Sequence, residues 1–162
     1  YEYGDTGRNS LRLLKDWSSE DSRKITGAFL NHSEHKYHSW DKLRFVVEES
    51  KEIGIKTMVF GGTQEEFANA CELKPDFVAF EPVELIASPT TSVAKSDSVG
   101  IKKAAEVAKK IGIPLIVGAG VKDADDVRVC VELGSVGVAV SSAIIRAEDP
   151  KAVVLDLAKG FS

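Results

Sequence analysis

The sequence lacks the features of a membrane protein, a disulfide-linked protein or a nucleic-acid-binding protein. Its 162 residues contain no apolar run approaching the roughly 18 residues that cross a bilayer, and we expect no signal peptide. The formal net charge is −4, whereas a protein that binds nucleic-acid phosphates presents a basic face. We therefore expect a cytoplasmic protein with no membrane partner and no nucleic-acid partner.

Cysteine and histidine are scarce as well. The two cysteines, Cys71 and Cys130, stand outside any CxxC or metal-ligand spacing, which predicts two reduced, partly buried thiols. The three histidines, His32, His35 and His38, fall close together, but without Cys ligands or a second set of carboxylates this spacing does not favour a metal site. We expect neither a metal nor a cofactor.

What the chain does contain is typical of one globular domain, spanning residues 1–162. It is 43% hydrophobic and 28% charged, and it is long enough to bury a sizeable core. Five short apolar runs each precede a helical pattern, as strands buried on both faces of a parallel sheet do. This alternation predicts an α/β protein with about five parallel strands, at residues 25–30, 56–60, 77–80, 115–117 and 136–140.

Helix-capping residues mark the segments between these runs. Ser39 can begin a helix that ends at Gly54. Thr63 and Glu66 form a capping box for the next helix, which stops before Pro75. Further helices are predicted over residues 10–17, 99–111 and 123–133, and from Asp149-Pro150 onward.

The positions of glycine decide between two α/β architectures. A doubly wound sheet that binds dinucleotides has a Gly-rich turn after an early strand, and none is present. Gly61-Gly62, Gly118 and Gly120 instead follow later strands, whose carboxyl ends build the active-site face of a (β/α)8 barrel. Because eight units need about 200 residues or more, the sequence predicts a partial or shortened (β/α)8 barrel of about five units.

Two strand ends carry candidates for acid–base chemistry. Asn31-His32-Ser33-Glu34 follows the first run, and a His beside a carboxylate at a strand end suits proton transfer. A solvated, helix-capping loop is the alternative. Glu81 ends the third run, where apolar surroundings would raise its pKa and make it a better base. The alternative there is an exposed carboxylate.

Further segments are candidates for binding. Residues 82–98 are rich in Ser, Thr, Ala and Pro, and a loop of this length is a lid, a binding loop or a merely variable surface loop. The turn Gly118-Ala119-Gly120 and the pair Ser141-Ser142, one unit later, can offer backbone N–H groups of the kind that bind phosphate.

Together these motifs resemble the archaeal-type triosephosphate isomerases. Leu30-Asn31-His32-Ser33-Glu34 resembles the segment after strand four of that family, and Glu81-Pro82-Val83-Glu84-Leu85-Ile86 resembles the segment after strand six. The Gly-Ala-Gly turn and the later Ser-containing turn resemble those after strands seven and eight. Gly4-Asp5-Thr6-Gly7 resembles the third loop, so the chain resembles units four to eight, preceded by the third loop and helix.

The resemblance implies an isomerase of glycolysis and gluconeogenesis that interconverts dihydroxyacetone phosphate and glyceraldehyde 3-phosphate. It implies that Glu81 is the base and His32 the electrophile, a pairing already established for this family. Asn31 and Glu34 would support them, and residues 82–95 would close as a lid that excludes water. The phosphorylated sugar would contact Ile86, Gly118, Gly120, Ser141 and Ser142.

The chain also departs from the family pattern. Ala87-Ser88-Pro89 replaces the Gly-Thr-Gly of the lid, and Pro89 has no N–H to offer a phosphate. Ala143 replaces the Gly after the strand-eight Ser. The chain begins at Tyr1, just after the point that matches strand three, and no residue matches the Asn and Lys that strand one supplies. Two alternatives follow. One is an inactive or weakly active, self-associating barrel fragment. The other is another phosphate-binding barrel, aldolase-like or of the thiamine pathway, in which His32 is structural.

A five-stranded parallel fragment leaves two unpaired edges and an uncovered inner side. Exposed apolar surface of that kind drives association, so we expect a homo-oligomer or a complex with the missing segment. Size-exclusion chromatography with light scattering is the measurement. A mass of two or more chains is the expected result, and a monodisperse monomer would contradict it.

Overall fold

The structure is a computed structural model, and it describes residues 11, 14–16, 25–88 and 90–162. Within these residues five parallel strands form one sheet in the order β1-β2-β3-β4-β5, so each strand lies beside the next in the sequence. The predicted alternation of about five parallel strands with helices is confirmed. The strands are β1 (Gly27–Leu30), β2 (Lys56–Gly61), β3 (Phe77–Phe80), β4 (Leu115–Val117) and β5 (Gly137–Val138).

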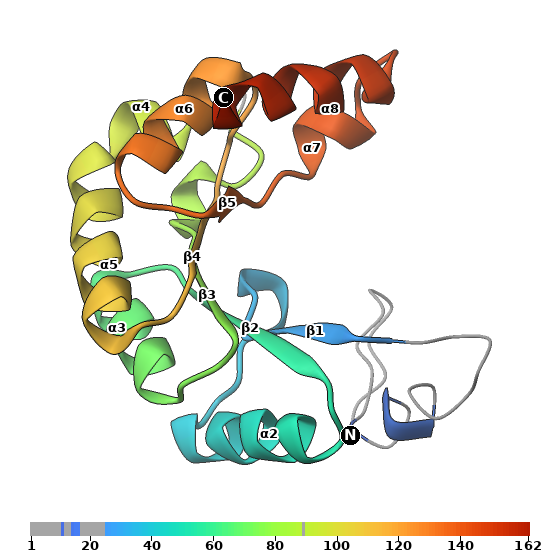
Figure 1. Cartoon of the computed structure of the whole chain (residues 1–162), viewed down its shortest axis with the longest axis vertical. Helices are drawn as coiled ribbons and strands as arrows, with labels where there is room; N and C mark the ends of the chain where they lie inside the picture. Colours follow the sequence, from blue (N-terminus) through green and yellow to red (C-terminus); the bar gives the residue numbers. More distant parts are fainter. Residues whose placement is uncertain (1–10, 12–13, 17–24, 89) are drawn as a thin grey trace.

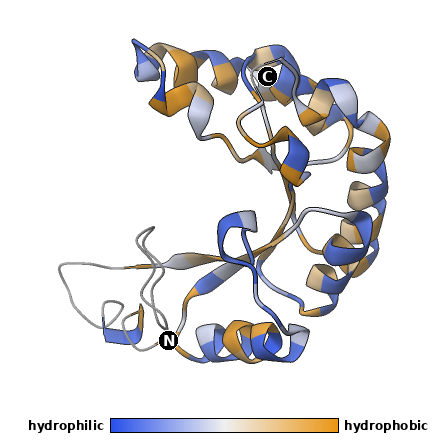
Figure 2. Cartoon of the chain, turned by 180° about the vertical axis from the view of Figure 1, so that it is seen from behind, coloured by the Kyte–Doolittle hydropathy of each residue, from blue (hydrophilic) through white to orange (hydrophobic). Residues whose placement is uncertain are grey.

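The long helices pack on one side of the sheet. In Figure 1 the sheet and its helices form an arc, and α2, α3, α5 and α6 lie along its outer side. Hydrophilic and hydrophobic residues both occur along the ribbons of these helices (Figure 2), as expected for helices that cover a sheet. The longer helices are α2 (Trp40–Glu52), α3 (Gln64–Glu72), α5 (Ser98–Ile111), α6 (Ala124–Glu132) and α8 (Pro150–Ala158). Shorter turns are η1 (Ser33–His35), η2 (Val83–Leu85), α4 (Val93–Ser96), α7 (Ser142–Ile145) and η3 (Lys159–Phe161).

The helices begin where side chains satisfy their first backbone N–H groups. The Ser39 side chain accepts from the Lys42 N–H at 3.5 Å, and Asp149 Oδ1 accepts from the Ala152 N–H at 3.0 Å. Each such cap contributes about 1 kcal/mol. Thr63 Oγ1 accepts from the Glu66 N–H at 3.1 Å as predicted, and Glu66 Oε2 accepts from the Gly62 N–H at 2.9 Å, one residue ahead of the expected partner.

The core lies between the sheet and the outer helices. One cluster of buried side chains centres on Phe67 and Phe80, whose rings meet edge to face at 5.9 Å, and a second centres on Val47 and Val59. Burying a side chain of this size contributes about 1.5–3 kcal/mol. Cys71 and Cys130 are both fully buried free thiols, and burial raises their pKa values to about 11 and about 12, so both are inert neutral core residues.

The strands at the two edges of the sheet are β1 and β5. β1 and β5 each pair on one side only within the described residues, and Phe29 on β1 is 70% exposed. β5 is shorter than the predicted run, but the Val136 and Ala139 N–H groups still donate to β4 carbonyls at 2.8 and 2.9 Å.

Of the helix predicted over residues 10–17, residues 11 and 14–16 are described and helical, and Gly4–Gly7 lie outside the described residues. None of the helices in the described part of the chain is long and apolar enough to cross a membrane.

Candidate active site

Parallel strands bring their carboxyl ends to one edge of the sheet, and the candidate residues lie on the loops that follow those ends. Asn31, His32 and Glu34 follow β1, Glu81 follows β3, and Gly118 and Gly120 follow β4. Ser141 and Ser142 lead from β5 into α7. Residues up to 111 positions apart in the chain, Asn31 and Ser142, therefore meet at the same edge, the one that carries the active site in barrel enzymes.

Asn31 fixes the loop that presents His32. Its backbone adopts a left-handed φ of +60°, a conformation that Asn tolerates better than most residues. Its side chain is buried, and both ends of its amide are used: Nδ2 donates to the Phe60 carbonyl at 3.0 Å, and Oδ1 accepts from the Tyr37 N–H at 3.0 Å. Asn31 thus ties the loop after β1 to the neighbouring strand β2.

His32 and Glu81 contact each other directly. His32 Nε2 lies 3.0 Å from Glu81 Oε2, and the imidazole ring packs against the edge of Phe60 with centroids 5.0 Å apart. The Glu34 N–H donates to His32 Nδ1 at 3.5 Å. Since Nδ1 accepts, the tautomer that fits these contacts carries its hydrogen on Nε2 and donates it to the Glu81 carboxylate. The interpretation of Asn31–Glu34 as a plain capping loop does not account for this pairing.

Glu81 is buried rather than a surface carboxylate. Only 9% of the residue is exposed, and its backbone N–H donates to the Gly61 carbonyl at 3.0 Å, which extends the strand pairing to the site. Burial raises the pKa of Glu81, the contact with His32 opposes this rise, and the nearby Glu34 carboxylate adds to it. A carboxylate with a raised pKa is a stronger base than an exposed one.

Gly118 provides the room for the Glu81 carboxylate. A Cβ at Gly118 would lie 2.8 Å from Glu81 Oε1, closer than carbon and oxygen approach without displacement. Gly120, two residues on, has a positive φ of +69°, and a Cβ there would lie 2.7 Å from the Thr91 carbonyl oxygen. The first glycine leaves room for the Glu81 carboxylate, and the second leaves room for the backbone of the segment that follows β3.

A cleft of about 320 Å³ opens beside Glu81. One wall comes from Ile86 and Ala87, and the other comes from the turn after β4 and the residues that lead into α7. Six of the nine candidate residues line this cleft: Glu34, Glu81, Ile86, Gly120, Ser141 and Ser142. Of the other three, His32 contacts the Glu81 carboxylate, Gly118 leaves room for it, and Asn31 ties the loop that carries His32 to β2.

Arg146 also lines the cleft, and the sequence analysis missed it. It is the one cationic residue among those that line the cleft, and it follows α7 directly. Its spacing could have identified Arg146 from the sequence, because a residue four positions after Ser142 lies one helical turn further along the chain. Arg146 thus places a positive charge in the same cleft as Ser141 and Ser142.

The segment after β3 is more ordered than a plain loop. Residues 82–97 contain the turn η2 and the short helix α4, and Ala87 has a positive φ of +53°. Ser92, at the start of α4, is 1% exposed, so the second half of the segment is anchored in the fold. Ile86 and Ala87, in the first half, lie on the wall of the cleft.

In the described part of the chain, no group of three or more His, Cys, Asp or Glu side chains is arranged to hold a metal ion.

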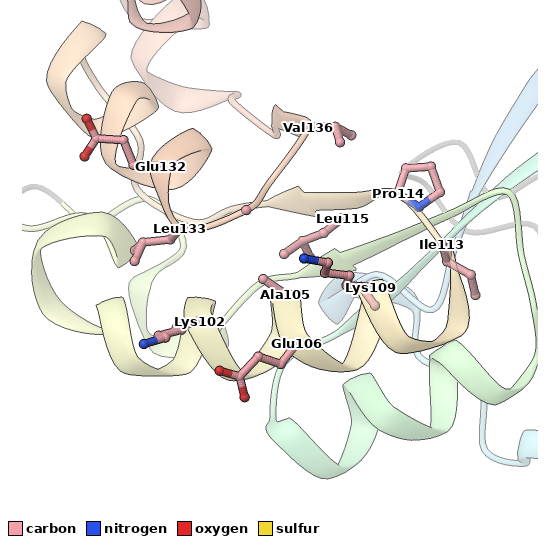
Figure 3. A pocket seen from close by; sticks show the side chains of 12 residues that line it. Lys102, Ala105, Glu106, Lys109, Ile113, Pro114, Leu115, Glu132, Leu133 and Val136 are labelled. Carbon is pink, nitrogen blue, oxygen red and sulfur yellow. The ribbon is translucent and has the colours of Figure 1, made fainter.

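A second cavity of about 410 Å³ lies at the opposite ends of the strands, where β4 and β5 begin (Figure 3). Lys102, Glu106 and Lys109 of α5 and apolar residues such as Ile113 and Leu115 line it. Its lining contains no His, Cys, Ser or Thr, and in barrels this end of the strands serves stability.

The comparison with known sequences decides the family. The triosephosphate isomerase of Metallosphaera sedula is 34% identical over 160 residues, which cover 98% of this chain and 67% of the relative. That of Methanobacterium bryantii is 35% identical over 155 residues, covering 94% of this chain and 67% of the relative. This chain belongs to the triosephosphate isomerase family. The enzyme of Thermoplasma volcanium is 34% identical over 145 residues, covering 90% of this chain and 64% of the relative.

This member of the triosephosphate isomerase family spans 59–67% of the length of the curated relatives it matches. A second family, described as thiazole biosynthesis protein ThiG, matches residues 87–161. That match covers β4, β5 and the glycine and serine turns, but it leaves out both His32 and Glu81. The ThiG match therefore covers only the later part of the chain.

Solved structures show the same fold. A chain of the tryptophan synthase α2β2 complex from Pyrococcus furiosus matches with a TM-score of 0.67 and 18% identity, covering 94% of this chain and 61% of that one. A mutant α-subunit of the same enzyme matches with a TM-score of 0.64 and 19% identity, covering 93% of this chain and 58% of that one. Tryptophan synthase α is a TIM-barrel protein, so the predicted partial (β/α)8 barrel is confirmed.

Proposed function

We propose that His32 and Glu81 form the proton-transfer centre of a triosephosphate isomerase, which interconverts dihydroxyacetone phosphate and glyceraldehyde 3-phosphate. The observation that carries the proposal is the 3.0 Å contact between His32 Nε2 and Glu81 Oε2 beside a cleft lined by Gly120, Ser141 and Ser142. A base, an electrophile and a phosphate-binding turn then surround one small cavity, as aldose–ketose isomerisation of a phosphorylated sugar requires.

Glu81 acts as the base in this proposal. Its carboxylate removes a proton from C1 of dihydroxyacetone phosphate, and the electron pair moves to form an enediolate. The hydroxyl proton moves from O1 to O2, and the same carboxyl group returns a proton to C2, which gives glyceraldehyde 3-phosphate with no net change in protons. The raised pKa supports this role, because a base is most effective when its pKa lies near the working pH.

His32 polarises the substrate carbonyl. Its Nε2–H, which donates to Glu81 in the free chain, would donate to the carbonyl oxygen and stabilise the negative charge that develops there. The substrate must therefore enter between His32 and Glu81 and replace their mutual contact. Glu34 supports the required tautomer, because its backbone N–H donates to Nδ1.

The phosphate group would bind at the far wall of the cleft. Gly120 can bring backbone N–H groups close to the phosphate, and Ser141 and Ser142 add a second turn at the start of α7. Arg146 adds a positive charge near these residues, which offsets the negative charges of Glu34 and Glu81 in the same cleft. Ile86 and Ala87, on the opposite wall, would cover the bound sugar and limit the entry of water.

The second candidate function is another phosphate-binding barrel protein, and the ThiG match over residues 87–161 favours it. Under that alternative the glycine and serine turns bind a phosphate, and His32 is structural. A weakly active fragment that binds substrate without fast turnover is the remaining alternative, because no residue here matches the strand-one Asn and Lys of the family.

Replacing His32 by Gln tests the proposed function. Turnover of dihydroxyacetone phosphate in a coupled assay should fall by about 100-fold, since Gln cannot place an imidazole N–H on the carbonyl. The matched control is His38→Gln, which changes an exposed histidine and should leave turnover unchanged.

The wild-type chain decides among the alternatives. Turnover above buffer that His32→Gln reduces and His38→Gln leaves unchanged supports the isomerase. Binding of 2-phosphoglycolate without turnover supports the weakly active fragment. Turnover equal to buffer together with no binding of 2-phosphoglycolate contradicts both and leaves the other kind of barrel.

A further inference from the structure

Asp126 is a buried carboxylate that joins two walls of the cleft. It lies in the first turn of α6 and is 1% exposed. Its Oδ1 accepts from the Ser92 hydroxyl at 2.8 Å and lies 3.1 Å from Lys95 Nζ, and both partners belong to the 82–97 segment. Its Oδ2 accepts from the Lys122 N–H at 3.0 Å, which belongs to the turn of residues 118–122 after β4. One carboxylate therefore holds two segments through separate oxygens.

Two further hydrogen bonds join the 82–97 segment to the 118–122 turn. The Val93 N–H donates to the Ala119 carbonyl at 3.0 Å, and Lys122 Nζ donates to the Thr91 carbonyl at 3.4 Å. A Cβ at Gly120 would lie 2.7 Å from the Thr91 oxygen and 3.1 Å from the Leu85 oxygen, so the two backbones are packed without spare room. In Figure 1, α4 lies beside α6, the helix that carries Asp126.

The charges around Asp126 come from a small set of groups. Lys95 is its cationic partner, and Lys95 also lies 3.4 Å from Asp123 Oδ2. Asp123 caps α6 by accepting from the Asp126 N–H at 2.8 Å. Removing a carboxylate from water is costly, and apolar side chains of similar size often give equal stability at such a position. A contribution to the geometry of the cleft explains the arrangement better than a contribution to stability alone.

We propose that Asp126 is a positioning residue for the ligand cleft. By fixing the end of the 82–97 segment to the 118–122 turn, it sets the separation between the wall formed by Ile86 and Ala87 and the wall formed by residues 119–121. Asp126 does not line the cleft, so it acts through Ser92 and Lys122. The effect on ligand binding rests on the proposed function, since the ligand is a phosphorylated sugar. The effect on the positions of the two segments is independent of the proposed function.

Asp126→Asn in the full chain is the first test, because it keeps the shape of the side chain and removes its charge. Hydrogen exchange followed by mass spectrometry should show amide exchange at least about tenfold faster in residues 91–97 and 118–122, and unchanged in α2 and α3. The dissociation constant of 2-phosphoglycolate should rise by about tenfold. The matched control is Asp125→Asn, at a neighbouring residue whose carboxylate pairs with Arg128 on the surface, and it should change neither measurement.

Ser92→Ala is the second variant, because it removes one hydroxyl and serves even if Asp126→Asn does not fold. It should give a smaller change in the same two segments. Exchange that is unchanged in these segments, or that rises equally throughout the chain, would overturn the proposal. If the wild-type chain binds no 2-phosphoglycolate, the proposed function fails, while the hydrogen-exchange result still decides the role of Asp126.

Discussion

Glu81→Gln should lower isomerase turnover by about 1000-fold while leaving the chain at least as stable as the wild type near neutral pH. The amide cannot remove a proton, and loss of a general base costs about 100- to 10,000-fold in rate. The side chain keeps its length, so it still fills the space beside Gly118 and faces His32. Coupled turnover assays on both proteins measure the first effect. Glu48→Gln, an exposed position on α2, is the control that should change nothing.

The effect on stability has a sign that depends on pH. Burial raises the pKa of Glu81 in the folded chain above its unfolded value, so the folded state binds this proton more tightly than the unfolded state does. The contribution to stability is therefore present at low pH and is lost as the pH rises through the raised pKa. Gln does not titrate, so the free energy of unfolding of the wild type relative to Glu81→Gln should fall with rising pH. Urea unfolding across that range measures it, and a difference independent of pH would contradict the account.

The same titration sets the lower limit for activity. The base must be deprotonated, so turnover should decrease as the pH falls through the raised pKa of Glu81, above the range of an ordinary exposed Glu. If the base were an exposed carboxylate with an ordinary pKa, turnover would persist to lower pH.

Gly120→Ala should have the largest effect of any single methyl group in the site. The residue has a φ of +69°, and the new Cβ would lie 2.7 Å from the backbone oxygen of Thr91, which accepts from Lys122 Nζ. The strained φ and the steric overlap together should lower the free energy of unfolding by about 2–4 kcal/mol. Binding of 2-phosphoglycolate should weaken as well, since the turn and the opposite wall of the cleft must move apart.

Gly54→Ala is the matched control for this change. Gly54 has a similar φ of +74°, but a Cβ there would meet nothing within 4 Å. Gly54→Ala should therefore cost only the strain of the left-handed backbone, about 1 kcal/mol. Urea unfolding of both variants separates strain from overlap. Equal losses in the two variants would show that the contact with Thr91 contributes nothing.

Much of the fold could be predicted because its signals are local. The strands are continuous apolar runs, and the helix starts at Ser39, Thr63 and Asp149 are set by side chains three residues from the N–H groups they cap. The order of the elements then limits the sheet, since strand–helix–strand connections give parallel neighbours. The least accurate element, β5, lies at the edge of the sheet, where pairing on one side constrains its length least.

The site was only partly predictable. His32 and Glu81 could be identified because each follows an apolar strand, and parallel strands bring these ends together. Their 3.0 Å contact and the burial of Glu81 depend on packing between β1, β2 and β3. Asp126 gave no signal, because Asp123, Asp125 and Asp126 all suit the first turn of a helix. Only the packing of the 82–97 segment distinguishes Asp126 from the exposed Asp125 beside it.

Proton exchange from the substrate tests the central claim most directly. Dihydroxyacetone phosphate is incubated with the chain in deuterated water, and the C1 hydrogens are followed by proton NMR. If Glu81 removes a proton beside a carbonyl polarised by His32, deuterium enters C1 with the wild-type chain and Glu81→Gln reduces that rate to the level of buffer. Exchange at the buffer rate with the wild-type chain, in a sample that binds 2-phosphoglycolate, would contradict the account.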